Sequence, residues 1–588
     1  MSGPMSIPLR TGGDFLLDAT APTDVFTPER LTDEHRAIGQ MVDEFWSHDI
    51  EPSLDALRRR EPGVARRLLR AAAAAGLTSM QIPEDEGGLA LDLPSVMVVV
   101  ERLARDASFL GWYLGHCGIG MLPLLLYGTP ELRRHYLPRM AAAELIGAYA
   151  LTEPHAGTDA LAIRTRADLT PDGRHYVLNG QKMWITNGGE ADLFTVFAKV
   201  NGEALTAFLV ERSAGLTNGP DEQKMGLSGT STTALYFDNV HVPAANVLGE
   251  VGRGHAIAFN ILNIGRLELG PNMAGAAKDV LAASVQYASS RAAFGTTIAS
   301  FGAVQHKLAD MVARIFATES VTWRTVGLVE ADTARRQGAS ALGRPEAEAL
   351  AFEEFAAECS IVKVVASEML DAVADHGVQI HGGYGYHRDY LVERAYRDAR
   401  INRIFEGTNE INRLIVPGLI LKRAVRVDRG LLAEAATVRA RVAELATTPP
   451  AVDDETMVAR MRLVALLVFD AAHRRGGDAL RVPQEAVMAL ADTIIEAFVA
   501  ESVWLRAQAI GAAPTAALAA ATARVCLCDA LPRVAQAAAT ALPALLDQTE
   551  ARAALAAVRA LTATDAIDIV TLRRQIAEEA IGRARYPF

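Results

Sequence analysis

The feature that most constrains this chain is a β-rich segment that lies between two long helical regions. Residues 146–255 hold short runs of β-branched and aromatic residues between turn residues, for example at 176–180, 193–198 and 234–239. On either side, apolar residues recur every three or four positions, as at 34–46, which is typical of amphipathic helices. The fold must therefore combine packed helices with a central β domain, which we expect to be a small barrel.

We predict a mainly α protein built from four parts. The 588 residues, half of them hydrophobic, can bury a large core but are too many for one compact domain. The parts are an N-terminal helical domain, a central β-barrel domain, a C-terminal four-helix bundle and an additional helical domain, at residues 1–145, 146–255, 256–424 and 425–588. Long helical segments indicate the bundle at 258–290, 302–331 and 348–376.

The charge balance argues against nucleic acid as a partner. Acidic residues outnumber basic ones, 70 to 58, and no run of Lys and Arg could follow a phosphate backbone. The four cysteines are sparse, and Cys526 and Cys528 are too close together for zinc ligands, so we expect no metal site and a reduced, cytoplasmic protein. The first residues lack a secretory pattern, and we expect no apolar run near the roughly 20 residues of a membrane-spanning helix.

One segment of the central domain carries groups suited to a planar or phosphorylated ligand. In residues 148–159, Pro154 and Gly157 impose an irregular backbone, while Thr152 and Thr158 offer hydroxyl groups. Such a loop can present amide and hydroxyl donors to an electron-rich heterocycle or a phosphate. For this stretch taken alone, an ordinary turn is the better explanation.

A second segment, residues 180–187, predicts a strand. The two-residue period of a strand puts Trp184 and Thr186 on one face. Trp184 could cover a flat ring while Thr186 meets the polar edge of that ring. A single tryptophan in a strand is more often a packed core aromatic, so this segment also needs its context.

Five further motifs follow in order along the chain. They lie at residues 224–232, 237–243, 291–295, 379–385 and 403–413. Together with the two segments above, they resemble the acyl-CoA dehydrogenase family over about residues 30–420. Motifs of several kinds in register make a chance match a poor explanation.

The resemblance implies an FAD cofactor that is held partly by a second subunit. The flavin end is assigned to residues of the central domain, namely Tyr149, Leu151, Thr152, Gly157, Thr158, Trp184, Ile185 and Thr186. The diphosphate and adenosine end is assigned to Arg291, Phe294, Gln379, Ile380, His381, Gly382, Gly383, Thr408 and Glu410. For most of these residues the alternative is a helix cap or a tight turn.

The resemblance also assigns the catalytic base to Glu406. Gly407 permits close backbone approach there, and apolar neighbours can desolvate the carboxylate and raise its proton affinity. The alternative is a surface glutamate beside a turn. Some relatives carry the base on a helix directly before an arginine, but here Gly265 precedes Arg266, and a glycine cannot accept a proton. Glu268 lies about 200° around a helix from Arg266 and should point elsewhere.

The implied reaction is the α,β-dehydrogenation of an acyl-CoA thioester to a trans-2-enoyl-CoA. The base removes the α proton while the β hydrogen leaves as hydride to the flavin, and the electrons then pass to an electron-transfer flavoprotein. The family's substrate positions correspond to Thr158, Asn263, Arg266 and Gly407.

Two glycines bear on the length of the substrate. Gly111 and Gly115 lie one helical turn apart and match positions where medium-chain enzymes carry larger polar side chains that close the pocket floor. Their absence would lengthen the tunnel, which predicts long-chain acyl substrates. Close helix packing at small residues explains the same two glycines.

The helical extension after residue 425 is similar to that of the family's very-long-chain branch, in which it accompanies a dimer. We therefore expect a homodimer, with the apolar stretch 462–469 in the core and peripheral membrane contact as a less favoured option. Two other functions stay open. An acyl-CoA oxidase would return the electrons to oxygen, and a scaffold or assembly protein would keep the flavoprotein fold without needing catalysis.

Overall fold

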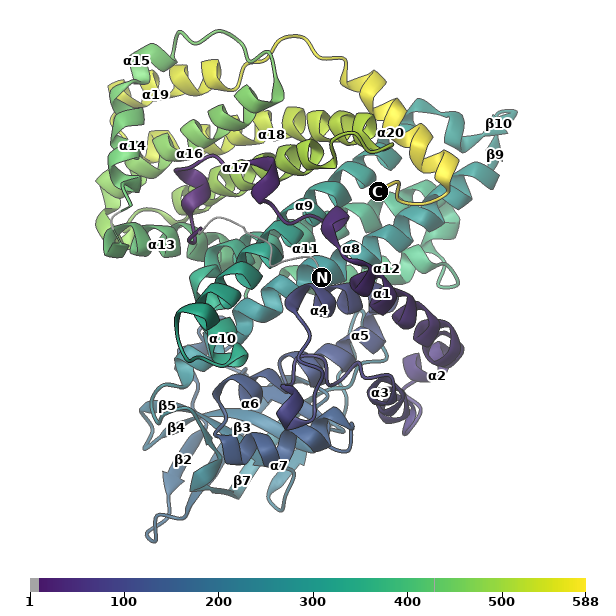
Figure 1. Cartoon of the computed structure of the whole chain (residues 1–588), viewed down its shortest axis with the longest axis vertical. Helices are drawn as coiled ribbons and strands as arrows, with labels where there is room; N and C mark the ends of the chain where they lie inside the picture. The colour runs from purple at the N-terminus through teal and green to yellow at the C-terminus, as the bar shows by residue number, and fades with distance from the viewer. Residues whose placement is uncertain (1–9, 428) are drawn as a thin grey trace. The chain divides into compact units, whose positions relative to one another are not determined.

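The computed structural model describes residues 10–427 and 429–588, and the chain divides into two compact units (Figure 1). The first, here called the β-containing unit, comprises Leu31–Gly275 and Thr333–Glu353. The second, here called the helical unit, comprises the residues up to Arg30 together with Ala276–Asp332 and Glu354–Phe588.

The β-containing unit begins with helices, as predicted for the N-terminal part. They are α1 (Asp33–Phe45), α2 (Leu54–Arg58), α3 (Val64–Ala74), α4 (Leu93–Leu103), α5 (Ala107–Tyr113), α6 (Leu122–Tyr127) and α7 (Pro130–Ala141). Helix α1 begins where it does because Thr32 caps it. The Thr32 hydroxyl accepts from the N–H of His35, and the His35 ring accepts from the N–H of Thr32.

The central strands form one mixed sheet of eight strands. They are β1 (Gly147–Ala150), β2 (Arg166–Leu169), β3 (His175–Thr186), β4 (Leu193–Val200), β5 (Ala204–Glu211), β6 (Leu216–Asn218), β7 (Thr232–Pro243) and β8 (Val247–Leu248). The order is β6-β7-β3-β2-β4-β5-β8, with β1 parallel to β4. The β domain is confirmed, although within the described residues no pairing joins β6 to β8, so hydrogen bonds leave the expected barrel open.

One hydrophobic core joins the N-terminal helices to this sheet. Phe109 from α5 packs in the same cluster as Phe194 and Phe208 from the strands. The buried Trp112 indole donates to the carbonyl of Gly229 at 2.8 Å. Helix α5 is therefore fixed to the β domain by both apolar burial and a buried hydrogen bond.

Long helices follow the sheet. They are α8 (Gly254–Ser290), α9 (Gly302–Ala339), α10 (Arg344–Glu354), α11 (Ala356–His381), α12 (Leu391–Ala399) and α13 (Asn409–Val427). The segment predicted as one helix at 348–376 is divided between α10 and α11, because Phe355 leaves the helical backbone with φ −100° and ψ 26°. The other two predicted long helices are confirmed.

The extension folds as a further set of helices. They are α14 (Leu431–Ala440), α15 (Val442–Leu445), α16 (Asp454–Gly476), α17 (Gln484–Ile510), α18 (Ala516–Leu545), α19 (Gln548–Leu561) and α20 (Ile569–Arg583). Helix α17 packs on α16, α18 and also α13. Residues 464–470 are buried, so the apolar stretch 462–469 lies mainly in the core, as expected.

Two stretches, Ala107–Tyr127 and Ala516–Leu545, are long and apolar enough to cross a membrane by length and composition. The expectation that no stretch approaches this length was therefore wrong. That expectation considered only uninterrupted apolar runs. The mean hydropathy of a stretch can stay high even where small residues interrupt the apolar run. In the structure 78% of the first apolar window and 56% of the second are buried, which is the behaviour of helices in a protein core.

A buried ion cluster holds the C-terminal end of the helical unit. Glu319 accepts from Arg506 at 2.8 Å, from Lys278 at 2.5 Å and from the Tyr586 hydroxyl at 2.6 Å. Arg506 also pairs with Glu29 at 2.8 Å. Burial acts to raise the pKa of Glu319, but the two cations outweigh burial and hold that pKa well below its ordinary value.

We predict that Glu319→Gln lowers the free energy of unfolding by about 3–5 kcal/mol, because it removes the carboxylate that two buried cations face. Thermal and urea unfolding measure the loss. The carboxyl pKa is depressed, so the contribution is fully present above pH 4.5, the ordinary value, and is lost as the pH falls further. The exposed Glu578→Gln should change stability by less than about 0.5 kcal/mol, and equal effects of both variants would contradict the prediction.

Candidate active site

The predicted site residues lie on both units. Those assigned to the flavin and, apart from Gly407, those assigned to the substrate are on the β-containing unit. Glu406 and the residues assigned to the other end of the cofactor are on the helical unit. Each unit holds a buried polar network of its own.

A buried ion pair shapes the loop after β1. Glu153 Oε1 lies 2.8 Å from Lys182 Nζ, and the two side chains are 2% and 0% exposed. Lys182 also donates to the carbonyl of Leu151 at 3.0 Å, and Glu153 accepts from both the N–H and the hydroxyl of Thr165. The pair therefore fixes the course of the loop that carries Thr152.

Burial opposes the charge on both partners of this pair. It lowers the pKa of the Lys182 ammonium to about 8. Burial also acts to raise the pKa of Glu153, but the Lys182 charge and the hydrogen bonds outweigh it and leave that pKa below its ordinary value. Because the carboxylate is so well hydrogen-bonded, the pair is ionic at neutral pH.

The other predicted residues of this loop differ in exposure. Tyr149 is buried in the sheet, where its hydroxyl donates to the carbonyl of Ala258 at 3.3 Å. Only the backbone of Tyr149 is therefore placed to meet a cofactor. Gly157 and Thr158 are exposed, and Thr152 is half-buried.

The end of β3 presents an exposed indole. Trp184 is 54% exposed while Ile185 beside it is buried and Thr186 is half-buried. The β3–β7 register shifts between Lys182 and Ile185, and Trp184 itself has a left-handed φ of 61°. This bulge breaks the simple two-residue alternation by which the facing of Trp184 was predicted. Trp184 and Thr186 nevertheless both stay unburied enough to meet a ligand.

Asn187 ties the end of β3 to its surroundings. It is fully buried and has a φ of 63°. Its Nδ2 donates to the carbonyl of Trp112 at 3.1 Å and to that of Gly147 at 3.4 Å. One side chain thus connects β3 to α5 and to β1.

The two glycines of the predicted pocket floor face the β domain. A Cβ added at Gly111 would lie 2.8 Å from Thr230 Oγ1, and one at Gly115 would lie 2.7 Å from Asn187 Nδ2 and 2.9 Å from Thr186 Cγ2. Such distances leave no room for a side chain. The geometry therefore favours close packing as the reason for both glycines, and the predicted lengthening of the tunnel loses this support.

Asn263 and Arg266 lie together on α8, and both are buried. Arg266 Nη1 donates to Asn263 Oδ1 at 3.0 Å. Glu268 is buried as well, but beside Gly118, where an added Cβ would lie 3.1 Å from its Oε2. That Glu268 is directed away from the catalytic site stays a prediction.

On the helical unit, Glu406 lies in the short loop that connects η12 (Arg400–Arg403), a 3₁₀ turn, to α13. Its side chain is partly buried. Glu406 and Gly407 both have left-handed backbone, with φ of 56° and 79°. Glycine adopts this conformation freely, but for a glutamate it is strained.

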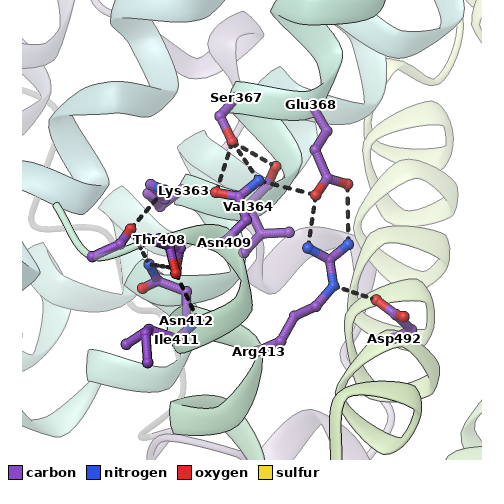
Figure 2. A network of polar contacts seen from close by, with 11 residues as sticks. Lys363, Val364, Ser367, Glu368, Thr408, Asn409, Ile411, Asn412, Arg413 and Asp492 are labelled. Carbon is purple, nitrogen blue, oxygen red and sulfur yellow. Dashed lines mark hydrogen bonds and ion pairs between the residues drawn. The ribbon is translucent and has the colours of Figure 1, made fainter. Parts of the chain in front are cut away.

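Buried donors hold the carbonyls of this loop (Figure 2). Lys363 Nζ, on α11, donates to the carbonyl of Gly407 at 2.8 Å. Asn412 Nδ2, on α13, donates to the carbonyls of Gly407 at 2.9 Å and Thr408 at 3.0 Å. Lys363 and Asn412 are both 0% exposed, so water does not compete for these contacts.

Thr408 is the N-cap of α13, since its hydroxyl accepts from the N–H of Ile411 at 3.2 Å. Glu410 is exposed in the first turn of the same helix, and a hydrogen bond from its own backbone N–H lowers its carboxyl pKa. The cap interpretation accounts for Thr408, and the adenosine contacts of both residues stay predictions.

Arg291 and Phe294 belong to a small exposed hairpin formed by β9 (Ala292–Ala293) and β10 (Thr296–Thr297). Phe294 and Gly295 form the turn with φ of 52° and 81°, the positive pair that a tight two-residue turn requires. Phe294 is 96% exposed, which suits a residue that another molecule covers.

The motif at residues 379–385 begins within the end of a helix. Gln379, Ile380 and His381 are the last residues of α11, which ends where Gly382 leaves the helical backbone with φ 60° and ψ −134°. Ile380 and His381 are buried, and the contacts of both with FAD stay predictions. Gln379, Gly382 and Gly383 are exposed, and there is open space around both glycines.

Sequence reasoning missed the side chains that hold these backbones. They are Glu153, Lys182, Asn187, Lys363, Asn409 and Asn412. Several of them lie inside the motifs, and this position was the only indication of their role in the sequence. Their partners are distant in sequence, 29 residues for Glu153–Lys182 and 46 for Lys363–Asn409, so spacing alone does not pair them.

Family definitions match the chain in four consecutive segments. The acyl-CoA dehydrogenase N-terminal domain matches residues 32–144, the middle domain 148–240 and the C-terminal domain 252–418. A second family, also described as an acyl-CoA dehydrogenase C-terminal domain, matches residues 460–560.

Individual relatives agree with this division. A probable acyl-CoA dehydrogenase of Bacillus subtilis is 40% identical over 98% of each chain. The human mitochondrial very long-chain specific acyl-CoA dehydrogenase is 38% identical over 69% of this chain and 60% of its own. A crystal structure of an acyl-CoA dehydrogenase from Bacillus anthracis, complexed with FAD, is 39% identical, with a TM-score of 0.94 over 98% of this chain and 100% of its own.

The chain therefore belongs to the acyl-CoA dehydrogenase family, as the motifs predicted. Within that family, the chain carries an additional C-terminal helical domain. The two Bacillus relatives match this chain over nearly the full length of both chains, so their match includes this domain.

We predict that Glu153→Gln lowers the free energy of unfolding by about 3–5 kcal/mol, because it leaves the Lys182 ammonium buried without a counter-charge. Thermal unfolding of the purified protein measures the loss. The matched control is Glu153→Leu combined with Lys182→Met, which removes both charges and should recover most of the stability. A double variant as unstable as Glu153→Gln would contradict the explanation.

We predict that Gly115→Ala costs about 1–3 kcal/mol, because its Cβ overpacks against Asn187 and Thr186. Gly157→Ala, where an added Cβ meets nothing within 4 Å, is the matched control and should be neutral. Denaturant unfolding compares the two variants. A Gly115→Ala protein of normal stability with a preference shifted to shorter acyl chains would restore the pocket interpretation.

Proposed function

We propose that this protein catalyses the FAD-dependent α,β-dehydrogenation of a long-chain fatty acyl-CoA to a trans-2-enoyl-CoA. The observation that carries the proposal is the backbone of Glu406. Its left-handed φ of 56° is strained for a glutamate, and buried donors from two helices hold the adjoining carbonyls. A glutamate that served only as a polar surface group would need no such support.

The β-containing unit fits a flavin. The bulge in β3 leaves the large Trp184 ring half exposed beside a buried residue, which suits contact with a planar partner. Thr152, Thr158 and Thr186 keep partly or fully exposed side chains with hydroxyls that can serve a polar ring edge. When bound, FAD supplies the acceptor for the hydride that leaves the β carbon.

The protein's own residues have two tasks in this reaction. Glu406 accepts the α proton, and the loss of that proton builds negative charge on the thioester oxygen. The resemblance assigns the backbone N–H of Glu406 as a donor to that oxygen. Because Lys363 and Asn412 hold the following carbonyls, they fix the direction of both the carboxylate and this N–H.

Four finer points belong to the proposal, namely the chain length of the substrate, the electron acceptor, the oligomeric state and the location. Long-chain substrates are supported by the likeness to a very long-chain specific enzyme. An electron-transfer flavoprotein is the acceptor that the family resemblance implies. We propose a homodimer, for which the exposed Phe294 hairpin offers a contact surface. A cytoplasmic location is supported by the four free cysteines.

We predict that anaerobic addition of palmitoyl-CoA bleaches the flavin of the purified protein, and that Glu406→Gln slows this step by about 10²–10⁴-fold while FAD stays bound. Stopped-flow absorbance of the flavin band measures the rate. Glu434→Gln, on an exposed position of α14, is the control and should bleach normally.

Three results, from this experiment, from its repetition with butyryl-CoA and from aerobic turnover, would change the proposal. A normal bleaching rate in Glu406→Gln would overturn the assignment of the base. A strong preference for butyryl-CoA over palmitoyl-CoA would contradict long-chain specificity. Stoichiometric peroxide during aerobic turnover would make the protein an oxidase.

A further inference from the structure

The extension contributes a carboxylate to the helix that follows the base. Arg413 of α13 donates through Nε to Asp492 Oδ1 at 2.7 Å. Asp492 lies on α17, within the separately matched segment 460–560, whereas the main family match ends at residue 418. A butyryl-CoA dehydrogenase of Megasphaera elsdenii, matched over 99% of its own length, covers only 67% of this chain. Asp492 therefore belongs to the part that distinguishes the longer form.

The other edge of the Arg413 guanidinium leads back to the base loop. Nη1 and Nη2 donate to the two carboxylate oxygens of Glu368 at 2.7 and 3.1 Å. Glu368 Oε1 also accepts from Asn409 Nδ2 at 2.9 Å, and Asn409 Oδ1 accepts from Lys363 Nζ at 2.6 Å. Lys363 is the donor to the Gly407 carbonyl. Figure 2 shows the part of this path that runs from Asp492 through Arg413 and Glu368 to Asn409.

Each member of the path restrains the next. All three guanidinium nitrogens of Arg413 are engaged, so the plane of the group is fixed between two carboxylates. Glu368 is 43% exposed and could move on its own, whereas the Asn409 side chain that it holds is buried. Asp492 fixes the Nε edge, which Glu368 does not reach.

We infer that Asp492 is a positioning residue for the catalytic base, through which the C-terminal extension sets the conformation of the Glu406 loop. The inference rests on the proposed function. Without the Asp492 carboxylate, Arg413 is free to turn toward Glu368 alone, and the shift reaches Gly407 through Asn409 and Lys363. The carboxylate of Glu406 then samples poorer directions toward the α proton, while the surfaces that bind acyl-CoA are unchanged.

The test compares Asp492→Asn with the wild type in anaerobic stopped-flow reduction by palmitoyl-CoA. We expect the limiting rate of flavin reduction to fall about 10- to 100-fold, as a misplaced catalytic group does, with the apparent Kd for the thioester within about twofold. Asp492→Glu keeps the charge and should recover most of the rate. In a Glu406→Gln background, Asp492→Asn should change nothing further, because it acts only through the base.

The matched control is Glu496→Gln, one turn along α17, which breaks an ion pair to Arg533 inside the extension. It should reduce its flavin at the wild-type rate. Equal rates for Asp492→Asn and the wild type would overturn the inference, as would equal losses in Asp492→Asn and Glu496→Gln. If the wild type itself is not bleached by any acyl-CoA, the proposed function fails instead.

Discussion

The left-handed backbone at Glu406 is the constraint on which the site depends. A non-glycine residue in this region costs about 1–3 kcal/mol and persists only where its surroundings enforce it. Here the enforcement is electrostatic, because an ammonium and an amide from two helices take the carbonyl of Gly407, which is itself left-handed. Both donors are buried, so their hydrogen bonds are strong and costly to break. The direction of the carboxylate is thus a property of α11 and α13 together.

The β-containing unit uses the same arrangement. Trp184 and Asn187 also have left-handed backbone, and both stand in a motif that the resemblance connects with the flavin. The strain at Asn187 is held by its buried amide, and the loop opposite is held by the Glu153–Lys182 pair. In each unit, therefore, a buried polar side chain supports a neighbouring backbone conformation that costs energy. This supported backbone sets the direction of the side chains that are assigned to the reaction or to the ligand.

Hydrophobic periodicity predicted the helices and strands, and the order of the motifs predicted the family. Neither of them predicts which side chains contact one another between these helices and strands. The helix at α1, the β domain and the long helices follow from patterns that a few neighbouring residues create. The role of Gly115 does not follow from such a pattern. The sequence does not distinguish a glycine that leaves space for a substrate from one that lets Asn187 pack closely. The helical segment predicted at 348–376 ended too early, since α11 runs on to His381. Burial of Lys182 could not be predicted either, since lysine is almost never fully buried without a partner.

The Arg413 ion pairs fix the orientation of side chains more than they add to the free energy of unfolding. Asp492 and Glu368 are 41% and 43% exposed, and ion pairs of such exposure contribute only about 0–1 kcal/mol each. By contrast, the side chains of Arg506 and Glu319 in the same unit are 1% and 2% exposed, and the loss of one partner of such a buried pair costs about 3–5 kcal/mol. An arginine held on all three nitrogens by two separate helices restricts direction even where it adds little free energy. The C-terminal extension thus contacts α13, the helix that follows Glu406, through an ion pair that restricts direction more than it adds stability.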